Sequence, residues 1–472
     1  MVTTNFVQNH HLQNSQFFLL PKRQLVTYAL YALIPLALLH YLLFNPVTTA
    51  KKPVVVVVQA TDDASVIASS HHEHVKVNAK QLPVPPSDQG DEVFKKNAIA
   101  GEVAAAAAAA AACDYSDGEW VPDARPPLYN GTSCATIKDG QNCMAHGRPD
   151  TGYLHWRWRP RRCDLPAFSP EAFLGWLRGK HLAFVGDSLA RNQAESLVCL
   201  LASRSTPELV HRDGEENRFR RWAFREHDAT VSIFWSPFLV KAAEKAERAG
   251  VRHNNVFLDA FDERWMSGLG GLDAVVLSIG HWFLIPGIYH DAGEVVGCHD
   301  CAEFNHTETP FFAVFRQAVH RTLAEITRRH VLAAGAGTSK SKSKVVAFTT
   351  FSPAHFEGEW DKAGACNKTR PYKNGEKEAG YTEAEMRKTV VEEVAAADAA
   401  AAGGGGAGLR FAALDVTTLA NLRPDGHPGP YMRGDPFAGG GGGARVQNDC
   451  VHWCLPGAID TFNEILLQTI TT

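Results

Sequence analysis

Cysteine is absent from the first 112 of the 472 residues, and all ten cysteines follow that point. An even number of cysteines confined to one part of a chain is typical of a disulfide-bonded domain in an oxidising compartment. A strong excess of charge of one sign is also lacking, because the formal net charge is only −4. This balance gives no indication of a nucleic-acid partner. No glycine-rich phosphate-binding or dinucleotide-binding fingerprint joins a convincing strand to a helix, which argues against a nucleotide-dependent enzyme.

An uncharged run of 20 residues lies near the N-terminus, from Leu25 to Phe44. It is long enough to cross a bilayer as a helix, and no small-residue cleavage site follows it closely. The sequence therefore predicts an uncleaved transmembrane signal anchor at 25–44 behind a cytoplasmic tail at 1–24. Basic residues flank the run on both sides, so charge alone leaves its orientation open. A buried core helix is the alternative interpretation of the run.

Three Asn-x-Ser/Thr sequences, which are acceptor sites for N-glycosylation, lie at Asn130, Asn305 and Asn367. Together with the cysteines they place the C-terminal part in the secretory lumen, which predicts a single-pass type II membrane protein. Residues 45–112 hold a proline-rich stretch and an alanine run, with little amphipathic pattern. We expect this stretch to be a disordered stem.

One folded lumenal domain is expected over 113–472. Its first part, 113–170, is dense in Cys, Trp, Pro and Gly, which is typical of an irregular segment held by disulfides. In the core at 171–472, apolar runs alternate with helical patterns, and this favours an α/β fold with a mostly parallel sheet. The expected strands are 181–185, 231–238, 272–279, 345–350 and 409–416, and the expected helices are 190–202, 310–329, 383–397 and 458–468.

The strongest local signal is the sequence Gly186-Asp187-Ser188, which joins an apolar strand to a helical pattern. A serine at such a junction can present its hydroxyl above the edge of the sheet. Its backbone N–H, at the start of the helix, can then help to stabilise an oxyanion. Gly186 would permit the tight turn. The alternative interpretation is an Asp-Ser helix cap, which is a common structural device.

A second signal lies far downstream, where Asp449 and His452 stand three residues apart beside Cys450 and Cys454. Nucleophilic catalysis by serine needs a base within hydrogen-bond reach and an acid that orients this base, and one segment here offers both. Cysteines with a histidine also suit zinc, here and at 298–301. In an oxidising compartment disulfides are the favoured interpretation of both segments, so no metal is expected.

The two signals together resemble the Gly-Asp-Ser-type (SGNH-like) esterases and acyltransferases. The resemblance is closer still to one plant family, the trichome birefringence-like polysaccharide O-acetyltransferases, and it spans essentially 113–472. The segments that carry it are 113–115, 118–121, 142–143, 147–150, 153–160, 163–166, 184–188 and 449–453. It implies an SGNH/GDSL-like three-layer α/β/α sandwich. The anchor and stem fit the Golgi membrane layout of that family, with the catalytic domain in the lumen.

By this resemblance Ser188 is the nucleophile, His452 is the general base and acid, and Asp449 orients His452. Ser188 would take an acetyl group, and a sugar hydroxyl would then take it from Ser188. The further candidates for oxyanion stabilisation or substrate binding are Gly186, Asp187, Arg191, Asn192, His281 and Trp453. His281 either contacts the ligand or caps the strand that precedes it.

A neutral glycan offers hydroxyls and flat apolar faces, so aromatic side chains are expected in an acceptor groove. The tryptophans near the implicated segments are Trp156, Trp158, Trp282 and Trp453, with core packing as the alternative for each. The resemblance implies no bound cofactor. The acetyl donor, such as acetyl-CoA or an acetylated carrier, would be a substrate, and a hemicellulose polysaccharide would be the acceptor.

Within that family, the segments 297–301 and 305–308 resemble most the branch that acts on xyloglucan. Mannan and xylan remain alternative acceptors. A polysaccharide acetylesterase is a further alternative, because the same triad would then pass the acetyl group to water. A non-catalytic glycan-binding or scaffold protein is an alternative of another class, which the presence of all three triad residue types disfavours.

Overall fold

A computed structural model describes residues 113–214, 218–245, 252–335, 343–404, 406–434 and 445–471. The predicted tail, anchor and stem, at 1–24, 25–44 and 45–112, lie outside the described residues. Among the helices that are described, none combines the length and the apolar character needed to cross a membrane.

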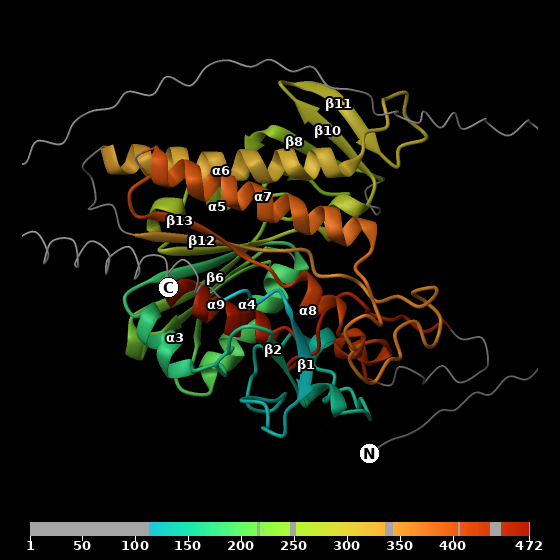
Figure 1. Cartoon of the computed structure of the whole chain (residues 1–472). Helices are drawn as coiled ribbons and strands as arrows, with labels where there is room; N and C mark the ends of the chain where they lie inside the picture. The colour runs from blue at the N-terminus through green and yellow to red at the C-terminus, as the bar shows by residue number, and fades with distance from the viewer. Residues whose placement is uncertain are drawn as a thin grey trace, which may run out of the picture. The chain divides into compact units, whose positions relative to one another are not determined.

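A seven-stranded sheet forms the centre of the described domain, with the strand order β13-β12-β9-β3-β6-β5-β4 (Figure 1). The strands are β3 (His181–Gly186), β4 (Glu208–Asp213), β5 (Phe219–Phe224), β6 (Ala229–Trp235), β9 (Ala274–Ser278), β12 (Lys344–Thr349) and β13 (Leu409–Leu414). β13, β12, β9, β3 and β6 run parallel, whereas β5 and β4 join antiparallel at one edge. These five parallel strands are the five that the sequence predicts, and the predicted α/β fold is confirmed.

Helices cover both faces of this sheet, because its strands are apolar on both sides. On β3, Leu182 and Phe184 point to one face, while Ala183 and Val185 point to the other. The first face packs against α3 (Pro170–Leu177), α4 (Ser188–Ala202) and α9 (Asp460–Thr471). The second face packs against α6 (Phe311–Gly335) and α7 (Tyr381–Gly403), as Figure 1 shows. The layers are therefore helices, sheet and helices.

A second, four-stranded sheet has the order β11-β10-β8-β7. Its strands are β7 (Val240–Ala243), β8 (Asn254–Phe261), β10 (Gly287–Asp291) and β11 (Glu294–His299). Neither this sheet nor the short helices α5 (Glu263–Met266) and α8 (Thr417–Asn421) were predicted from the sequence. Much of β11 is exposed, so the sequence lacks the continuous apolar run that marks a buried strand.

The segment expected to be irregular, 113–170, contains one antiparallel pair, β1 (Gly118–Pro122) and β2 (Trp156–Pro160). Trp120 and Trp158 face each other across the pair, and both rings are buried. The indole N–H of Trp120 donates to the carbonyl of Leu419, 2.8 Å away. Core packing, rather than a glycan groove, is therefore the role of Trp158.

All ten cysteines form disulfides, as predicted, which answers the question of connectivity that the sequence left open. The pairs are Cys113–Cys163, Cys134–Cys199, Cys143–Cys454, Cys298–Cys301 and Cys366–Cys450. Two of them end beside His452, since Cys450 and Cys454 flank it. The first part of the domain and the loop before α7 are thus bonded covalently to the segment predicted to carry catalysis.

Two carboxyl groups of α9 line a cavity of about 390 Å³ between α4, α9 and the first part of the domain. Burial raises the pKa of Glu464 to about 7 and that of Asp460 to about 6. Asp460 accepts hydrogen bonds from the hydroxyls of Tyr129 and Ser196. A carboxyl group whose folded-state pKa lies above its unfolded value stabilises the fold only while it is protonated.

We predict that Glu464→Gln flattens part of the pH dependence of stability. Glu464 stabilises the fold at pH 4, and this contribution is lost as the pH rises through about 7. Between pH 4 and pH 8 the free energy of unfolding should therefore change in favour of Glu464→Gln over the wild type, by on the order of 2 kcal/mol. Thermal unfolding at both pH values measures this gain. The control is Glu359→Gln at an exposed site. An equal shift in unfolding temperature at both pH values for Glu464→Gln would contradict the prediction.

Candidate active site

The Gly186-Asp187-Ser188 sequence forms the junction between β3 and α4, and only glycine fits its first position. Gly186 has a φ of +153°, and a Cβ atom there would lie 1.8 Å from the carbonyl oxygen of Ser278 on the neighbouring β9. Asp187 is the N-cap of α4, and its carboxylate accepts a hydrogen bond of 2.9 Å from the N–H of Leu189. Ser188 is the first residue of the helix and is partly exposed. The helix cap and the serine at the sheet edge are therefore both present in one turn.

Asp187 is buried, and burial raises its pKa to about 6 although the nearby His452 opposes this shift. The hydrogen bond from Leu189 also lowers the pKa of Asp187. Asp187 is thus a buried cap that supports the turn, without exposure to a ligand.

Asp449 and His452 form the predicted acid–base pair, with 2.7 Å between Asp449 Oδ2 and His452 Nδ1. The other carboxylate oxygen of Asp449 accepts from the backbone N–H groups of Val451 and His452, at 3.0 and 2.9 Å. Burial alone would raise the pKa of Asp449. The adjacent His452 and these hydrogen bonds outweigh burial and hold the pKa well below its usual range. Asp449 is therefore ionised, and it fixes both the ring and the backbone of His452.

The opposite nitrogen of the His452 ring, Nε2, is buried and has no hydrogen-bond partner among the described residues. The residue after His452 is bonded to α4, because the N–H of Trp453 donates to Asn192 Oδ1 at 2.8 Å. The bonds between Asn192 and Trp453 hold the segment that carries Asp449 and His452 against α4, the helix that Ser188 begins. A histidine held by a carboxylate and a serine at a helix start are the groups that nucleophilic catalysis by serine needs.

Asn192 has a different role from the one predicted. Its amide was a candidate oxyanion donor, but its Nδ2 donates to the carbonyl of Trp453 at 3.3 Å, and its Oδ1 accepts from the N–H of the same residue. The side chain is fully buried. Asn192 therefore holds the segment that carries His452, and the prediction that it is an oxyanion donor is not supported by this geometry.

Trp453 is also placed differently from the prediction. Its side chain is 0% exposed, its ring stacks on His427 with 4.3 Å between centroids, and its Nε1 donates to Ser352 Oγ at 3.2 Å. No face of the ring is open to a glycan. Core packing is the role that the structure gives it.

His281 and Arg191 lie near the same edge of the sheet. His281 follows β9 in a short 3-10 helix, and its Nε2 donates to the carbonyl of Ser352 at 2.9 Å. Burial lowers the pKa of His281 to about 4, so the ring is neutral and its proton is on Nε2. Arg191 is buried on α4, with its guanidinium 5.6 Å from the centroid of the Trp235 ring. Arg191 remains a candidate for stabilising an oxyanion.

The exposed aromatic side chains near His452 are not those that the sequence suggested. Trp282 packs edge-on against Trp235, with 5.5 Å between centroids, and Trp156 is half-buried against the core. Phe356 and Trp360, which were not singled out from the sequence, are 42% and 46% exposed. The sequence signal that could have identified this pair was the presence of two aromatic residues in an otherwise polar stretch.

The loop that carries Phe356 and Trp360 is fastened to the catalytic segment. The N–H of His355 donates to the carbonyl of Cys450 at 2.9 Å, and the N–H of Asn448 donates to the carbonyl of Trp360 at the same distance. The disulfide Cys366–Cys450 closes the loop. Its exposed rings are therefore held in a fixed relation to Asp449 and His452.

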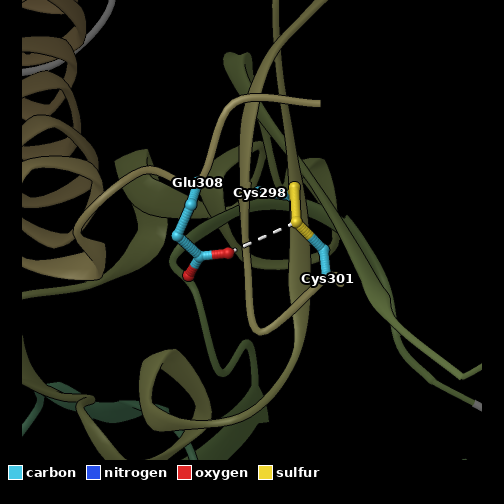
Figure 2. Close-up of side chains that lie close together, drawn as sticks. All are labelled: Cys298, Cys301 and Glu308. Atoms are coloured by element: carbon cyan, nitrogen blue, oxygen red, sulfur yellow. Dashed lines mark hydrogen bonds between the residues drawn. A yellow bond between two sulfur atoms is a disulfide. The ribbon is translucent and has the colours of Figure 1, made fainter. Parts of the chain in front are cut away.

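Cys298 and Cys301 form a disulfide in the second sheet, as favoured over a metal site (Figure 2). Figure 2 also shows the carboxylate of Glu308 directed at the disulfide, with 3.4 Å between Glu308 Oε2 and Cys301 Sγ. Both sulfur atoms are used in the S–S bond, so neither is a thiolate that could ligate an ion. This disulfide shapes the turn after β11.

The three predicted glycosylation sites, Asn130, Asn305 and Asn367, all lie at exposed positions outside helices and strands. Such positions are accessible to a glycosylating enzyme. Their modification remains a prediction.

We predict that Gly186→Ala abolishes the native fold of the active-site turn, because the added Cβ would overlap the carbonyl of Ser278. The expected result is a destabilisation of several kcal/mol, which thermal unfolding and the yield of soluble protein would reveal. Gly175→Ala is a matched control, because that glycine lies in α3 and the Cβ that alanine adds there would meet no atom within 4 Å. Wild-type stability of Gly186→Ala would refute this account of the turn.

Comparison with known proteins identifies relatives for almost the whole described domain. Residues 165–469 match the GDSL/SGNH-like acyl-esterase family found in Pmr5 and Cas1p, and residues 111–164 match the PMR5 N-terminal domain. The chain is 58% identical to xyloglucan O-acetyltransferase 2 of Populus trichocarpa over 359 residues, which cover 76% of this chain and 82% of that protein.

Two further relatives cover similar or larger shares of the chain. Xyloglucan O-acetyltransferase 1 of Arabidopsis thaliana is 44% identical over 450 residues, or 95% of this chain and 96% of that protein. Protein trichome birefringence-like 26 of the same species is 40% identical over 361 residues, or 76% of this chain and 77% of that protein. The chain therefore belongs to the GDSL/SGNH-like acyl-esterase family found in Pmr5 and Cas1p and, within it, to the trichome birefringence-like proteins.

Proposed function

We propose that this protein is a polysaccharide O-acetyltransferase that acetylates hydroxyls of cell-wall xyloglucan through an acetyl-Ser188 intermediate. The observation that carries the proposal is the state of His452, whose Nδ1 lies 2.7 Å from Asp449 Oδ2 while its Nε2 has no hydrogen-bond partner among the described residues. Relatives that are 58% and 44% identical are xyloglucan O-acetyltransferases, which favours the same acceptor here.

In the first step, His452 Nε2 takes the proton of the Ser188 hydroxyl while Ser188 Oγ attacks the acetyl carbonyl of the donor. The resulting oxyanion is stabilised by the Ser188 N–H at the start of α4, and Arg191 adds positive charge nearby. The donor's leaving group then departs with the proton from His452. Acetyl-CoA or an acetylated carrier would serve as the donor, and the protein itself needs no bound cofactor for this step.

In the second step, a sugar hydroxyl gives its proton to His452 and attacks the acetyl group on Ser188. The bond between the acetyl group and Ser188 Oγ breaks, and the proton returns to that oxygen. Asp449 stays ionised throughout and stabilises the protonated ring. If water took the place of the sugar, the same triad would act as an acetylesterase, so exclusion of water in favour of the glycan is what the transferase requires.

The loop with Phe356 and Trp360 supplies a surface suited to the glycan. The sugar rings of a neutral polysaccharide have apolar faces that stack on aromatic side chains. The hydrogen bonds and the disulfide of this loop hold its exposed rings to the catalytic segment. We assign the acceptor-binding surface to these two rings in place of Trp158 and Trp453, which are buried.

Five disulfides and three exposed glycosylation sequences support a lumenal catalytic domain. With the apolar run at 25–44, they support a single-pass type II protein of the Golgi membrane, where acceptor polysaccharide and acetyl donor would meet. The proposed anchor is a property of the sequence at 25–44, outside the described residues.

The central test compares the full-length protein with Ser188→Ala. Each is incubated with an acetyl donor and separate xyloglucan, mannan and xylan oligosaccharides, and mass spectrometry counts the acetyl groups gained. Acetylation of xyloglucan should fall by at least about 10³-fold in the variant, because the nucleophile is lost. Ser188-dependent acetylation of mannan or xylan instead would change the acceptor. Ser188-dependent loss of acetyl groups from acetylated glycans would establish the esterase, and no Ser188-dependent change in folded protein would refute the triad.

Trp360→Ala should raise the KM for the glycan by about fivefold with a smaller change in kcat, because stacking on an aromatic ring contributes on the order of 1 kcal/mol to binding. Steady-state kinetics with xyloglucan oligosaccharides measures both constants. Leu332→Ala on α6 is the control, since that side chain is 59% exposed on another element. An unchanged KM in Trp360→Ala would place the acceptor elsewhere.

A further inference from the structure

Two buried histidines lie directly behind the catalytic segment. His355 and His427 are 7% and 2% exposed, and His355 Nδ1 lies 2.8 Å from His427 Nε2. The outer nitrogen of each ring meets a backbone carbonyl. His355 Nε2 is 2.9 Å from the oxygen of Asn421, and His427 Nδ1 is 2.7 Å from the oxygen of His452. The carbonyl of the predicted catalytic base is therefore bound by a histidine side chain.

The number of protons in this chain of hydrogen bonds follows from the chemistry of its ends. A carbonyl oxygen only accepts, so His355 Nε2 and His427 Nδ1 must both carry hydrogen. In two neutral imidazoles, the two inner nitrogens would then both present lone pairs at 2.8 Å, which is a repulsive contact. A third proton between them converts this contact into a hydrogen bond. The observed geometry thus needs three protons on four nitrogens, which gives the pair one positive charge.

We propose that His355 and His427 are positioning residues for His452 that share this third, buried proton. The proposal rests on the catalytic role of His452 in the proposed function. The ring of His427 cannot turn freely, because it stacks on Trp453 at 4.3 Å with 23° between the planes. The shared proton therefore keeps His427 Nδ1–H directed at the carbonyl of His452, and so keeps the backbone of the base in place.

The surroundings of the pair act on its positive charge in opposite directions. Asp449, Asp425 and Glu383 favour the charge, whereas Lys377 and His452 oppose it. Two further cations lie around the pair, because Arg148 donates to the carbonyl of His427 at 2.7 Å and Arg423 forms an ion pair with Asp425 at 2.8 Å. Burial opposes the charge most and lowers the pKa of both His355 and His427. Because burial disfavours the charged pair, the third proton leaves as the pH rises.

Loss of that proton breaks the arrangement. With one hydrogen on each ring, the two inner nitrogens share a hydrogen bond only if one ring moves its hydrogen there from the nitrogen that faces a carbonyl. The carbonyl oxygen of His452 or that of Asn421 is then left without a donor. A buried carbonyl without a partner destabilises its segment, and the position of His452 loosens.

His355→Gln is the variant that isolates the shared proton. A glutamine amide nitrogen can still donate to the carbonyl of Asn421, but the substitution removes the titratable Nδ1 of His355 that faces His427. His427 then needs hydrogen only on Nδ1 and stays neutral, with its bond to the carbonyl of His452 intact. The variant is thus expected to fold and to act at all pH values at which His452 is a free base.

The test is nitrogen NMR of the full-length protein labelled with ¹⁵N-histidine, from pH 5 to 9, in which the shifts of the ring nitrogens report their protons. The wild type should show three protonated nitrogens on His355 and His427 at low pH and should lose one as the pH rises. His355→Gln should show a neutral His427 throughout. Two protonated nitrogens in the wild type across the whole range would overturn the shared proton. This readout needs no activity, so it is independent of whether the protein transfers acetyl groups.

Kinetics tests the positioning role. In the wild type, kcat should fall by about fivefold as the third proton is lost, which corresponds to one net hydrogen bond, and His355→Gln should lack this fall. Matching pH profiles for the two proteins would overturn the positioning role. Absence of Ser188-dependent acetyl transfer in the wild type would instead overturn the proposed function, and with it the catalytic meaning of the pair.

Discussion

Immobilisation of one short segment, 449–454, is the constraint on which the proposed active site depends. Asp449 ties the backbone and the ring of His452 together through three hydrogen bonds. Asn192, on α4, bonds both backbone groups of Trp453, and His427 donates to the carbonyl of His452. Disulfides fix the segment at Cys450 and Cys454. A segment without regular secondary structure is thereby fixed by side-chain hydrogen bonds and disulfides, and a base that serves two proton transfers requires such a fixed position.

The central sheet could be predicted from the sequence because its parallel strands are buried on both faces and read as continuous apolar runs. The same logic fails for strands at the edges of the two sheets. In the second sheet the first half of β11 is exposed, and at the edge of the central sheet β4 is exposed along its whole length. Neither strand therefore carries a hydrophobic pattern that distinguishes it from a loop. These strands depend on pairing with neighbours, and such pairing is a tertiary property that no local window of sequence contains.

The candidate site divides in the same way. The strand-to-helix turn at Ser188 and the hydrogen bond between Asp449 and His452 were predictable, because each lies in a short motif whose geometry is local. The role of Asn192 was not, since its partner Trp453 is 261 residues away in the chain. Trp453 was a candidate for glycan binding because it is an aromatic residue next to the base in the sequence, yet its side chain is buried in the core. The pair of His355 and His427 left no sequence signal at all, because neither histidine belongs to a recognisable motif and they are separated by 72 residues.

The disulfide between Cys143 and Cys454 links residues 311 positions apart. The thiol beside the base therefore has no partner until the ribosome has delivered both ends of the domain and the compartment has oxidised them. A chain that is incompletely synthesised, or that stays in a reducing environment, lacks this brace on its base. In the proposed function, the acetylating activity is in this way linked to an oxidising compartment, because the brace on the base forms only there.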